Sequence, residues 1–234
     1  MQIHALTVCV EYADFLALSV ERWLPGLASW TIVSTPGDRP TADIARAHGL
    51  RLHTTDVFYA NGAAFNKGAA MEEARAAMPW EDWILFLDAD IVPGYGWAQQ
   101  IDEYAPRCGQ LYSARRRECP DPSMVDNLSL QKNMSDGIGV GYFQLFHVDD
   151  PALEGDPLIE TDWVHAGCYD SSFMHRWPRR ARQLLPIRLV HVGERNNWFG
   201  RGNTEQFKTM MQLRRERGGY EHERIGVYGG SPCK

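Results

Sequence analysis

The chain has 234 residues, of which 44% are hydrophobic, 23% charged and 11% aromatic. This length supports one sizeable hydrophobic core rather than several, and the composition excludes disordered, collagen-like and coiled-coil proteins. The formal net charge is -6, yet residues 175–217 hold ten Arg and one Lys against three Glu. This basic segment is either a solvated surface or a face that meets an anionic ligand such as a diphosphate or a polyanionic acceptor.

Cysteine usage and hydropathy favour a cytoplasmic protein without a membrane partner. No apolar run approaches the ~20 residues of a spanning helix, and Gln2 and His4 interrupt the stretch where a secretory signal would be apolar. The five cysteines are odd in number and lack paired spacing, which predicts neither a disulfide framework nor a zinc site.

The first part of the chain alternates predicted strands and helices. Apolar and β-branched runs predict strands over 3–10, 30–34, 51–54 and 83–87, and helical spacing predicts helices over 15–24, 42–48 and 66–78. Thr41 is the expected cap of the second helix. Because 83–87 (WILFL) is continuously apolar, we expect a strand covered on both faces. The alternation predicts a parallel sheet with right-handed crossovers, as in doubly wound α/β folds.

The second part is less regular and contains no repeat. We expect helices over 97–104, 171–177 and 205–217, strands over 110–114, 139–148 and 187–192, and an acidic loop over 149–163. The early glycines of the 139–148 strand indicate close backbone approach. A loop rich in Gly, Asn and Arg follows the last strand.

Two carboxylates, Asp88 and Asp90, follow the buried 83–87 strand directly. Ligands bind at the carboxyl ends of strands in open α/β sheets, and carboxylates there need a positive partner. We expect the two side chains to diverge, so one can ligate a cation while the other reaches a bound water or a ribose hydroxyl. Oxygen ligands suit Mg²⁺ or Mn²⁺. The alternative is a polar turn after a strand.

Three segments together resemble a known family. LFLDADIVP, preceded by FNKGAA and followed by HVGERNNWFGR, is similar to GT-A glycosyltransferases of the family-two-like group, over most of the chain to about Arg201. The resemblance implies a single-domain GT-A type, Rossmann-like α/β fold whose mixed, mostly parallel sheet is flanked by helices. It implies a nucleotide-binding half over 1–92, an acceptor and metal-completing half over 93–217, and a C-terminal tail over 218–234.

The resemblance also implies a cation site. Asp88 and Asp90 match the family's Asp-x-Asp, with Asp90 as the direct ligand, and His191 completes the coordination. An imidazole beside carboxylates favours Mn²⁺ over Mg²⁺. The alternative for His191 is a core histidine that bonds to a backbone carbonyl.

The remaining implied contacts belong to the nucleotide-sugar. Lys67, at a helix start, could also meet phosphate, and Gly141 borders the sugar and acceptor pocket. The loop after the last strand is either a lid over the diphosphate or an ordinary surface loop. The family's paired aspartates after the second strand are replaced here by residues 35–38 (TPGD). The implied donor-binding residues are Glu11, Tyr12, Asp38, Phe65, Asn66, Lys67, Asp88, Gly141, Arg195, Trp198 and Arg201.

An inverting transfer needs a carboxylate base within ~3 Å of the acceptor hydroxyl. Asp170 is the first candidate because it precedes a predicted helix as in the family's pattern, and Asp162 is its rival. Either residue could instead be a helix N-cap.

The sequence therefore predicts a metal-dependent glycosyltransferase of the hexosyltransferase type, which moves a sugar with inversion from a nucleotide-diphosphate donor, UDP-sugar favoured, to an acceptor hydroxyl. A saccharide is the favoured acceptor, and a hydroxymethylated DNA base is the second. The alternatives are a nucleotidyltransferase, a nucleotide-sugar hydrolase, and a non-catalytic module that binds carbohydrate or nucleic acid.

Overall fold

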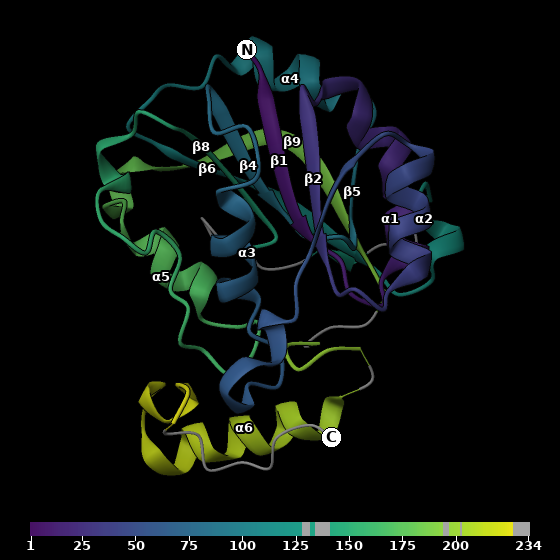
Figure 1. The fold of residues 1–234 in the computed structure, drawn as a ribbon. Coiled ribbons are helices and arrows are strands. Elements are labelled where there is room, and N and C mark those ends of the chain that lie inside the picture. The colour runs from purple at the N-terminus through teal and green to yellow at the C-terminus, as the bar shows by residue number, and fades with distance from the viewer. Residues whose placement is uncertain (128–131, 134–140, 194–196, 202, 227–234) are drawn as a thin grey trace.

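The computed structural model describes residues 1–127, 132–133, 141–193, 197–201 and 203–226 (Figure 1). In this part of the chain a nine-stranded sheet has the order β3-β2-β1-β4-β8-β6-β9-β5, and β7 pairs with β6. The strands are β1 (Ile3–Val8), β2 (Ser29–Ser34), β3 (Arg51–Thr54), β4 (Trp83–Leu87), β5 (Ile91–Pro93), β6 (Leu111–Cys119), β7 (Lys132–Asn133), β8 (Phe143–His147) and β9 (Arg182–Val192). The α-helices are α1 (Ala13–Trp23), α2 (Arg39–Ala47), α3 (Lys67–Arg75), α4 (Trp97–Tyr104), α5 (Tyr169–His175) and α6 (Thr204–Arg217).

Strand directions confirm the predicted mixed, mostly parallel sheet. Strands β3, β2, β1 and β4 pair in parallel. Strand β8 runs antiparallel to both β4 and β6, so β6 has the direction of β4 again, and β9 is parallel to β6. On the main path only β8 and β5 run the other way. The carboxyl ends of the remaining strands therefore meet at one edge of the sheet.

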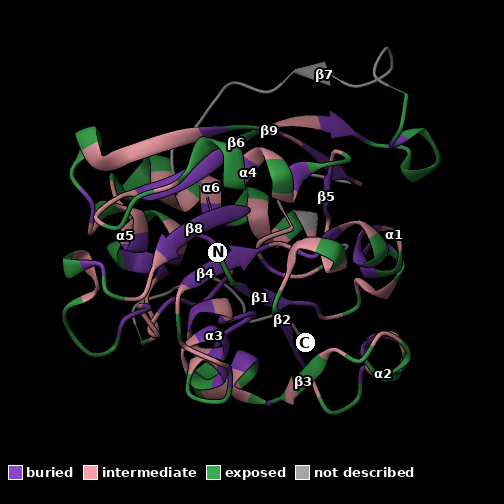
Figure 2. Cartoon of the chain, turned by 90° about the horizontal axis from the view of Figure 1, so that it is seen from above, coloured by how far each residue is buried: buried purple, intermediate pink, exposed green. Residues whose placement is uncertain are grey.

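Helices cover both faces of the sheet (Figure 1). Trp23 of α1 and Trp97 of α4 pack on one face, and Met71 of α3 and Phe173 of α5 pack on the other. The side chains of β4 alternate between these two clusters and are all buried, as the continuous apolar run predicts. Figure 2 shows the buried residues along the central strands and the exposed residues mostly on the outer helices and loops.

Several predicted boundaries are wrong, and long-range pairing explains most of them. Strand β6 continues to Cys119 and β9 begins at Arg182, because the two strands form one long parallel ladder that holds polar residues extended. Strands β5 and β7 have three and two residues and were not predicted. Of the expected 139–148 strand, 143–147 is formed, and 139–140 lie outside the described residues.

Helices α1, α2, α5 and α6 begin earlier than predicted, at Ala13, Arg39, Tyr169 and Thr204. Asp38, rather than Thr41, caps α2, and its Oδ1 accepts a hydrogen bond from the Thr41 backbone N–H at 3.2 Å. Helix α5 begins at Tyr169 instead of 171, so Asp170 lies in its first turn. None of the helices in the described ranges has both the length and the apolar character that a bilayer crossing requires.

Candidate functional site

A cavity of about 300 Å³ opens at the carboxyl edge of the parallel strands. Its walls come from the ends of β1, β4 and β9, the residues before β8, the starts of α3 and α5, and residues 197–200. The structure thus gathers segments that are far apart in the sequence. The predicted site residues that line this cavity are Tyr12, Phe65, Lys67, Asp88, Asp90, Gly141, Asp170, His191 and Trp198.

Asp90 and His191 are neighbours in the cavity. The ladder between β5 and β9 places His191 opposite Ile91, and the His191 Nε2 lies 3.3 Å from the Asp90 Oδ2. On the other side of the ring, Nδ1 lies 3.0 Å from the Oε2 of Glu118. Burial disfavours the charged imidazole, but the two carboxylates outweigh it and raise the pKa of His191 to about 9. The residue is therefore not a core histidine bonded to a carbonyl.

The Asp90–His191 pair fits a divalent cation. The Asp90 Oδ1 is buried and has no hydrogen-bond partner among the described residues, which is costly for a carboxylate oxygen unless a ligand meets it. One carboxylate oxygen and one imidazole nitrogen on the same cavity wall form a donor set that suits Mn²⁺.

Asp88 is held differently from Asp90, because residues 89–90 form a turn, whereas in an extended strand side chains two positions apart would share one face. Its carboxylate forms an ion pair with the ammonium of Lys67. The ligand atoms of Asp88, Asp90 and His191 do not all lie within 4.8 Å of one another. In the described ranges, the group whose ligand atoms do lie that close is His165, Cys168 and Glu223. Asp88 thus contacts Lys67 at the cavity wall instead of joining a preassembled set of three ligands.

Lys67 supplies a positive charge to the cavity. It begins α3, and its ammonium lies 5.3 Å from the centre of the Tyr169 ring. Burial disfavours the charged form of Lys67, yet Asp88 and Tyr169 more than compensate and raise its pKa above the ordinary value. The preceding Asn66 caps α3, since its Oδ1 accepts from the Ala69 N–H at 2.9 Å. Asn66 therefore positions Lys67 without lining the cavity itself.

Asp170 lines the cavity beside Gly141. Its Oδ2 accepts from the Gly141 N–H at 3.1 Å, and its Oδ1 accepts from the Ser171 N–H at 2.8 Å. A side chain at position 141 would overlap the Asp170 carboxylate, which explains the glycine. Burial raises the pKa of Asp170 above its ordinary value. The rival Asp162 does not line the cavity, and both its oxygens accept from Arg224.

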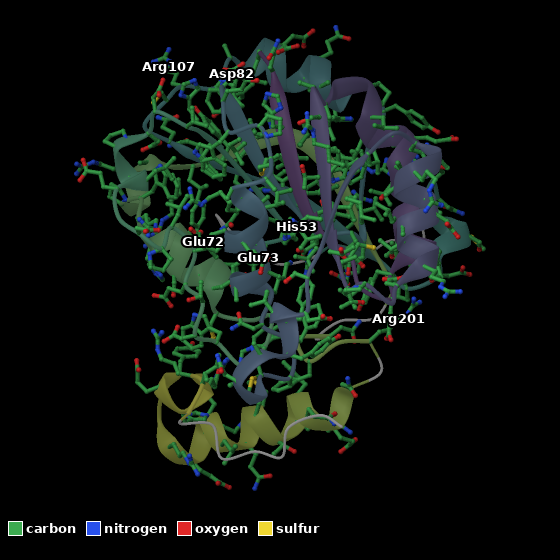
Figure 3. All side chains as sticks on the ribbon, in the orientation of Figure 1. His53, Glu72, Glu73, Asp82, Arg107 and Arg201 are labelled. Carbon is green, nitrogen blue, oxygen red and sulfur yellow. The ribbon has the colours of Figure 1, made fainter. Side chains whose placement is uncertain are left out.

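Three other predicted donor-binding residues, Glu11, Asp38 and Arg201, lie outside the cavity lining. The Asp38 Oδ2 accepts from the Glu11 N–H at 2.8 Å and so ties the ends of β1 and β2 together. Arg201, labelled in Figure 3, forms a two-point ion pair with Asp14 at 2.7 and 2.8 Å. Arg195 lies outside the described residues.

Trp198 closes one side of the cavity. Its ring stacks on His165 with 5.6 Å between ring centres. It also lies so close to Gly167 that an added Cβ there would be 2.5 Å from the indole. Phe207 of α6 contacts the indole edge-on at 5.2 Å. The expected loop after β9 is thus packed on the body of the protein through residues 197–200, while 194–196 and 202 lie outside the described residues.

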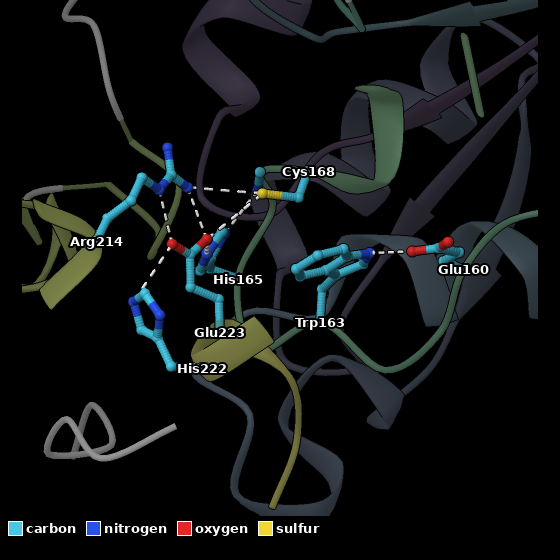
Figure 4. Close-up of polar contacts among 8 residues, drawn as sticks. Glu160, Trp163, His165, Cys168, Arg214, His222 and Glu223 are labelled. Atoms are coloured by element: carbon cyan, nitrogen blue, oxygen red, sulfur yellow. Dashed lines mark hydrogen bonds and ion pairs between the residues drawn. The ribbon is translucent and has the colours of Figure 1, made fainter. Parts of the chain in front are cut away.

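A buried ion cluster, drawn in Figure 4, contacts Trp198 through His165 and Arg214. Arg214 of α6 donates to both oxygens of Glu223, at 2.7 and 2.6 Å, and His165 Nε2 lies 2.9 Å from Glu223 Oε2. Cys168 lies beside them. His165, Cys168 and Glu223 have metal-binding atoms, but the guanidinium already provides the cation that Glu223 needs. The cluster is structural, and it anchors part of the expected C-terminal tail.

Sequence reasoning missed Arg116, Glu118 and Tyr169. Arg116 and Tyr169 line the cavity, and Glu118 contacts His191 from behind it. Arg116 and Glu118 lie two positions apart on β6, beyond residue 114, where the predicted strand ends. A longer predicted strand would have placed both on one face.

Comparisons with known proteins reveal a shared fold. No family model and no curated protein matches the sequence. Among solved structures, GalNAc-T7 with UDP, GalNAc and Mn²⁺ superposes with a TM-score of 0.57 at 10% identity, over 98% of this chain and 53% of that one. Glucosyl-3-phosphoglycerate synthase from Mycobacterium tuberculosis, with Mn²⁺, UDP and glucosyl-3-phosphoglycerate, gives 0.54 at 14% identity, over 93% and 80%.

The chain has the GT-A fold. Mannosyl-3-phosphoglycerate synthase from Rubrobacter xylanophilus adds a third match, with a TM-score of 0.51 at 14% identity, over 94% of this chain and 77% of that one. This chain spans about half the length of GalNAc-T7. At these identities the likeness concerns the fold, and the chemistry has to be argued from the cavity.

Proposed function

We propose that this chain is a metal-dependent glycosyltransferase that moves a sugar from a nucleoside-diphosphate donor to an acceptor hydroxyl with inversion. The observation that carries the proposal is the meeting of Asp90, His191 and Asp170 in one cavity at the carboxyl edge of the sheet. UDP and Mn²⁺ are the favoured nucleotide and cation, because both are named for structural neighbours with the same fold.

The donor end of the cavity is built around Asp90 and His191. A divalent cation held by these two residues would neutralise the diphosphate and stabilise its departure. Lys67 adds a positive charge to the cavity, and its ion pair with Asp88 holds that carboxylate at the cavity wall. Electrostatic stabilisation by such preorganised groups is commonly the largest contribution to catalysis.

The acceptor end is built around Asp170. The Gly141 and Ser171 N–H groups orient its carboxylate, and each oxygen retains a lone pair for a proton. Because burial raises the pKa of Asp170, it is a stronger base than an exposed aspartate. Asp170 would take the proton of the acceptor hydroxyl as that oxygen attacks the sugar from the face opposite the diphosphate.

A donor and acceptor screen tests the proposal. The protein is incubated with Mn²⁺, a set of UDP-sugars and two acceptor classes, saccharides and DNA with hydroxymethylated bases, and products are read by mass spectrometry. Sugar joined to an acceptor supports the proposal, and NMR of its anomeric centre tests inversion. Sugar released only to water indicates a hydrolase, transfer of the nucleotide indicates a nucleotidyltransferase, and ligand binding without turnover indicates a binding module.

A further inference from the structure

Glu118 is a buried carboxylate directly behind His191. Only 6% of the residue is exposed, and it does not line the cavity. The parallel ladder between β6 and β9 places Glu118 opposite His191, 73 positions later in the chain. The Glu118 Oε2 lies 3.0 Å from the His191 Nδ1, within hydrogen-bond distance.

This hydrogen bond decides which imidazole nitrogen faces the cavity. When Nδ1 donates its proton to a carboxylate, the remaining nitrogen, Nε2, is the one that can ligate a metal. The Nε2 of His191 is the atom that lies 3.3 Å from Asp90. The ring is thus held at both ends, with its ligating nitrogen beside the Asp90 carboxylate.

Packing alone does not account for a carboxylate at position 118. Burying an ionised group is costly, and a hydrophobic residue in its place is often as stable or more so. The structure instead places a cation beside this carboxylate, since the Arg116 Nε lies 3.5 Å from the Glu118 Oε1. Arg116 in turn lies over the Tyr142 ring, with its guanidinium carbon 4.2 Å from the ring centre.

We propose that Glu118 is a positioning residue for the cation site, where it fixes the tautomer and orientation of His191 without touching the cation. The proposal rests on the proposed function, because it presumes that His191 ligates a metal.

The test measures Mn²⁺ affinity by electron paramagnetic resonance of the free ion, in the presence of UDP, for the wild type, Glu118→Ala and Glu118→Gln. Glu118→Ala should weaken Mn²⁺ binding by about 10- to 100-fold, the usual effect of losing such a partner. Glu118→Gln keeps the shape and one oxygen acceptor, so it should fold even if Glu118→Ala does not, and it should weaken Mn²⁺ binding less than Glu118→Ala does.

A matched control is Glu73→Gln. Glu73 forms a comparable carboxylate–imidazole contact, with its Oε1 2.8 Å from the His53 Nε2, and neither residue lines the cavity (Figure 3). This variant should bind Mn²⁺ as the wild type does. The ¹⁵N shifts of His191 give an independent readout in the metal-free protein at a pH above about 9, where the ring is neutral: the wild type should show a protonated Nδ1 bonded to a carboxylate, and Glu118→Ala should lose that signature.

The two proposals fail in different ways. Unchanged Mn²⁺ affinity in both Glu118 variants, with binding lost in His191→Ala, would overturn the role of Glu118 and leave the cation site standing. A wild type that binds no Mn²⁺ with UDP would overturn the cation site and the role of Glu118 with it.

Discussion

Asp88 and Asp90 differ in environment although one residue separates them. Asp88 is neutralised by Lys67, whereas the Oδ1 of Asp90 is buried without a hydrogen-bond partner among the described residues. A carboxylate oxygen in that situation favours binding of a cation more strongly than a paired one. We therefore expect the two carboxylates to have separate roles, which single substitutions should reveal.

Asp90→Ala should reduce Mn²⁺-dependent sugar transfer by about 100-fold or more, because it removes preorganised stabilisation of the leaving diphosphate. Circular dichroism should show an unchanged fold, since the substitution also removes the buried Asp90 Oδ1, which has no hydrogen-bond partner among the described residues. Initial rates across a Mn²⁺ titration provide the measurement, with Asp102→Ala on α4, outside the cavity lining, as the control. Transfer at the wild-type rate by Asp90→Ala would contradict the assigned role.

Asp170→Asn should lower kcat by about 10²- to 10⁴-fold, the usual contribution of a general base. The amide keeps the shape of the side chain, so the dissociation constant for UDP with Mn²⁺ should stay unchanged in calorimetry. Asp162→Asn is the comparison, because Asp162 is paired with Arg224 outside the cavity. Equal loss of kcat in both variants would count against Asp170 as the base.

At the scale of elements, helix α6 and the short 3₁₀ helix Glu221–Glu223 are fixed to the cavity wall through charge. Glu223 is fully buried, with Arg214 and His165 as partners. His165 continues the contact to the wall, since its Nδ1 accepts from the Gly167 N–H at 2.9 Å, and Trp198 stacks on its ring. Loosening this cluster should therefore affect both stability and the shape of the cavity.

Glu223→Gln should lower the free energy of unfolding by about 3 kcal/mol, because it leaves the Arg214 charge without its partner. Urea unfolding at pH 7 measures the change. Glu205→Gln is a suitable control on α6, since Glu205 pairs with Lys208 on the exposed surface. A difference below the experimental error would mean that the cluster does not hold α6 in place.

The stabilisation from Glu223 should also depend on pH. Burial disfavours its charged form, but His165 and Arg214 outweigh burial and lower its pKa from 4.5 to about 2. In this range the unfolded chain binds the proton more readily than the folded protein, so stability rises with pH. The contribution is present above pH 4.5 and is lost as the pH falls through about 2. Comparing the urea midpoints of wild type and Glu223→Gln at pH 3 and pH 6 should show the smaller difference at pH 3.

At the scale of the whole molecule, the cavity joins segments from both halves of the chain, so its ligands should stabilise the entire fold. A ligand at 100 times its dissociation constant adds about 2.7 kcal/mol to the free energy of unfolding, which corresponds to a rise in Tm of about 5–10 °C at this size. Mn²⁺ and UDP together should produce this rise in differential scanning fluorimetry. Asp90→Ala should show none, and an equal rise in that variant would place the ligands elsewhere.

Local sequence patterns determined the elements and one part of the site. Hydrophobic periodicity and the WILFL run predict the alternating strands and helices of the first half, and Asp88 and Asp90 follow from their place at the end of a buried strand. These features depend on side-chain spacing within a few residues, which a single sequence displays directly.

Tertiary structure alone decided which distant residues meet. The β6–β9 ladder brings Glu118 to His191, the β5–β9 pairing brings His191 to Asp90, and the start of α3 brings Lys67 to Asp88. The choice of partner strand and its register depends on the packing of the whole sheet, because the hydrogen-bonding groups of every strand are alike. The sequence therefore predicts the residues of the carboxyl edge, whereas the pairing of each charge is fixed only when the sheet is assembled.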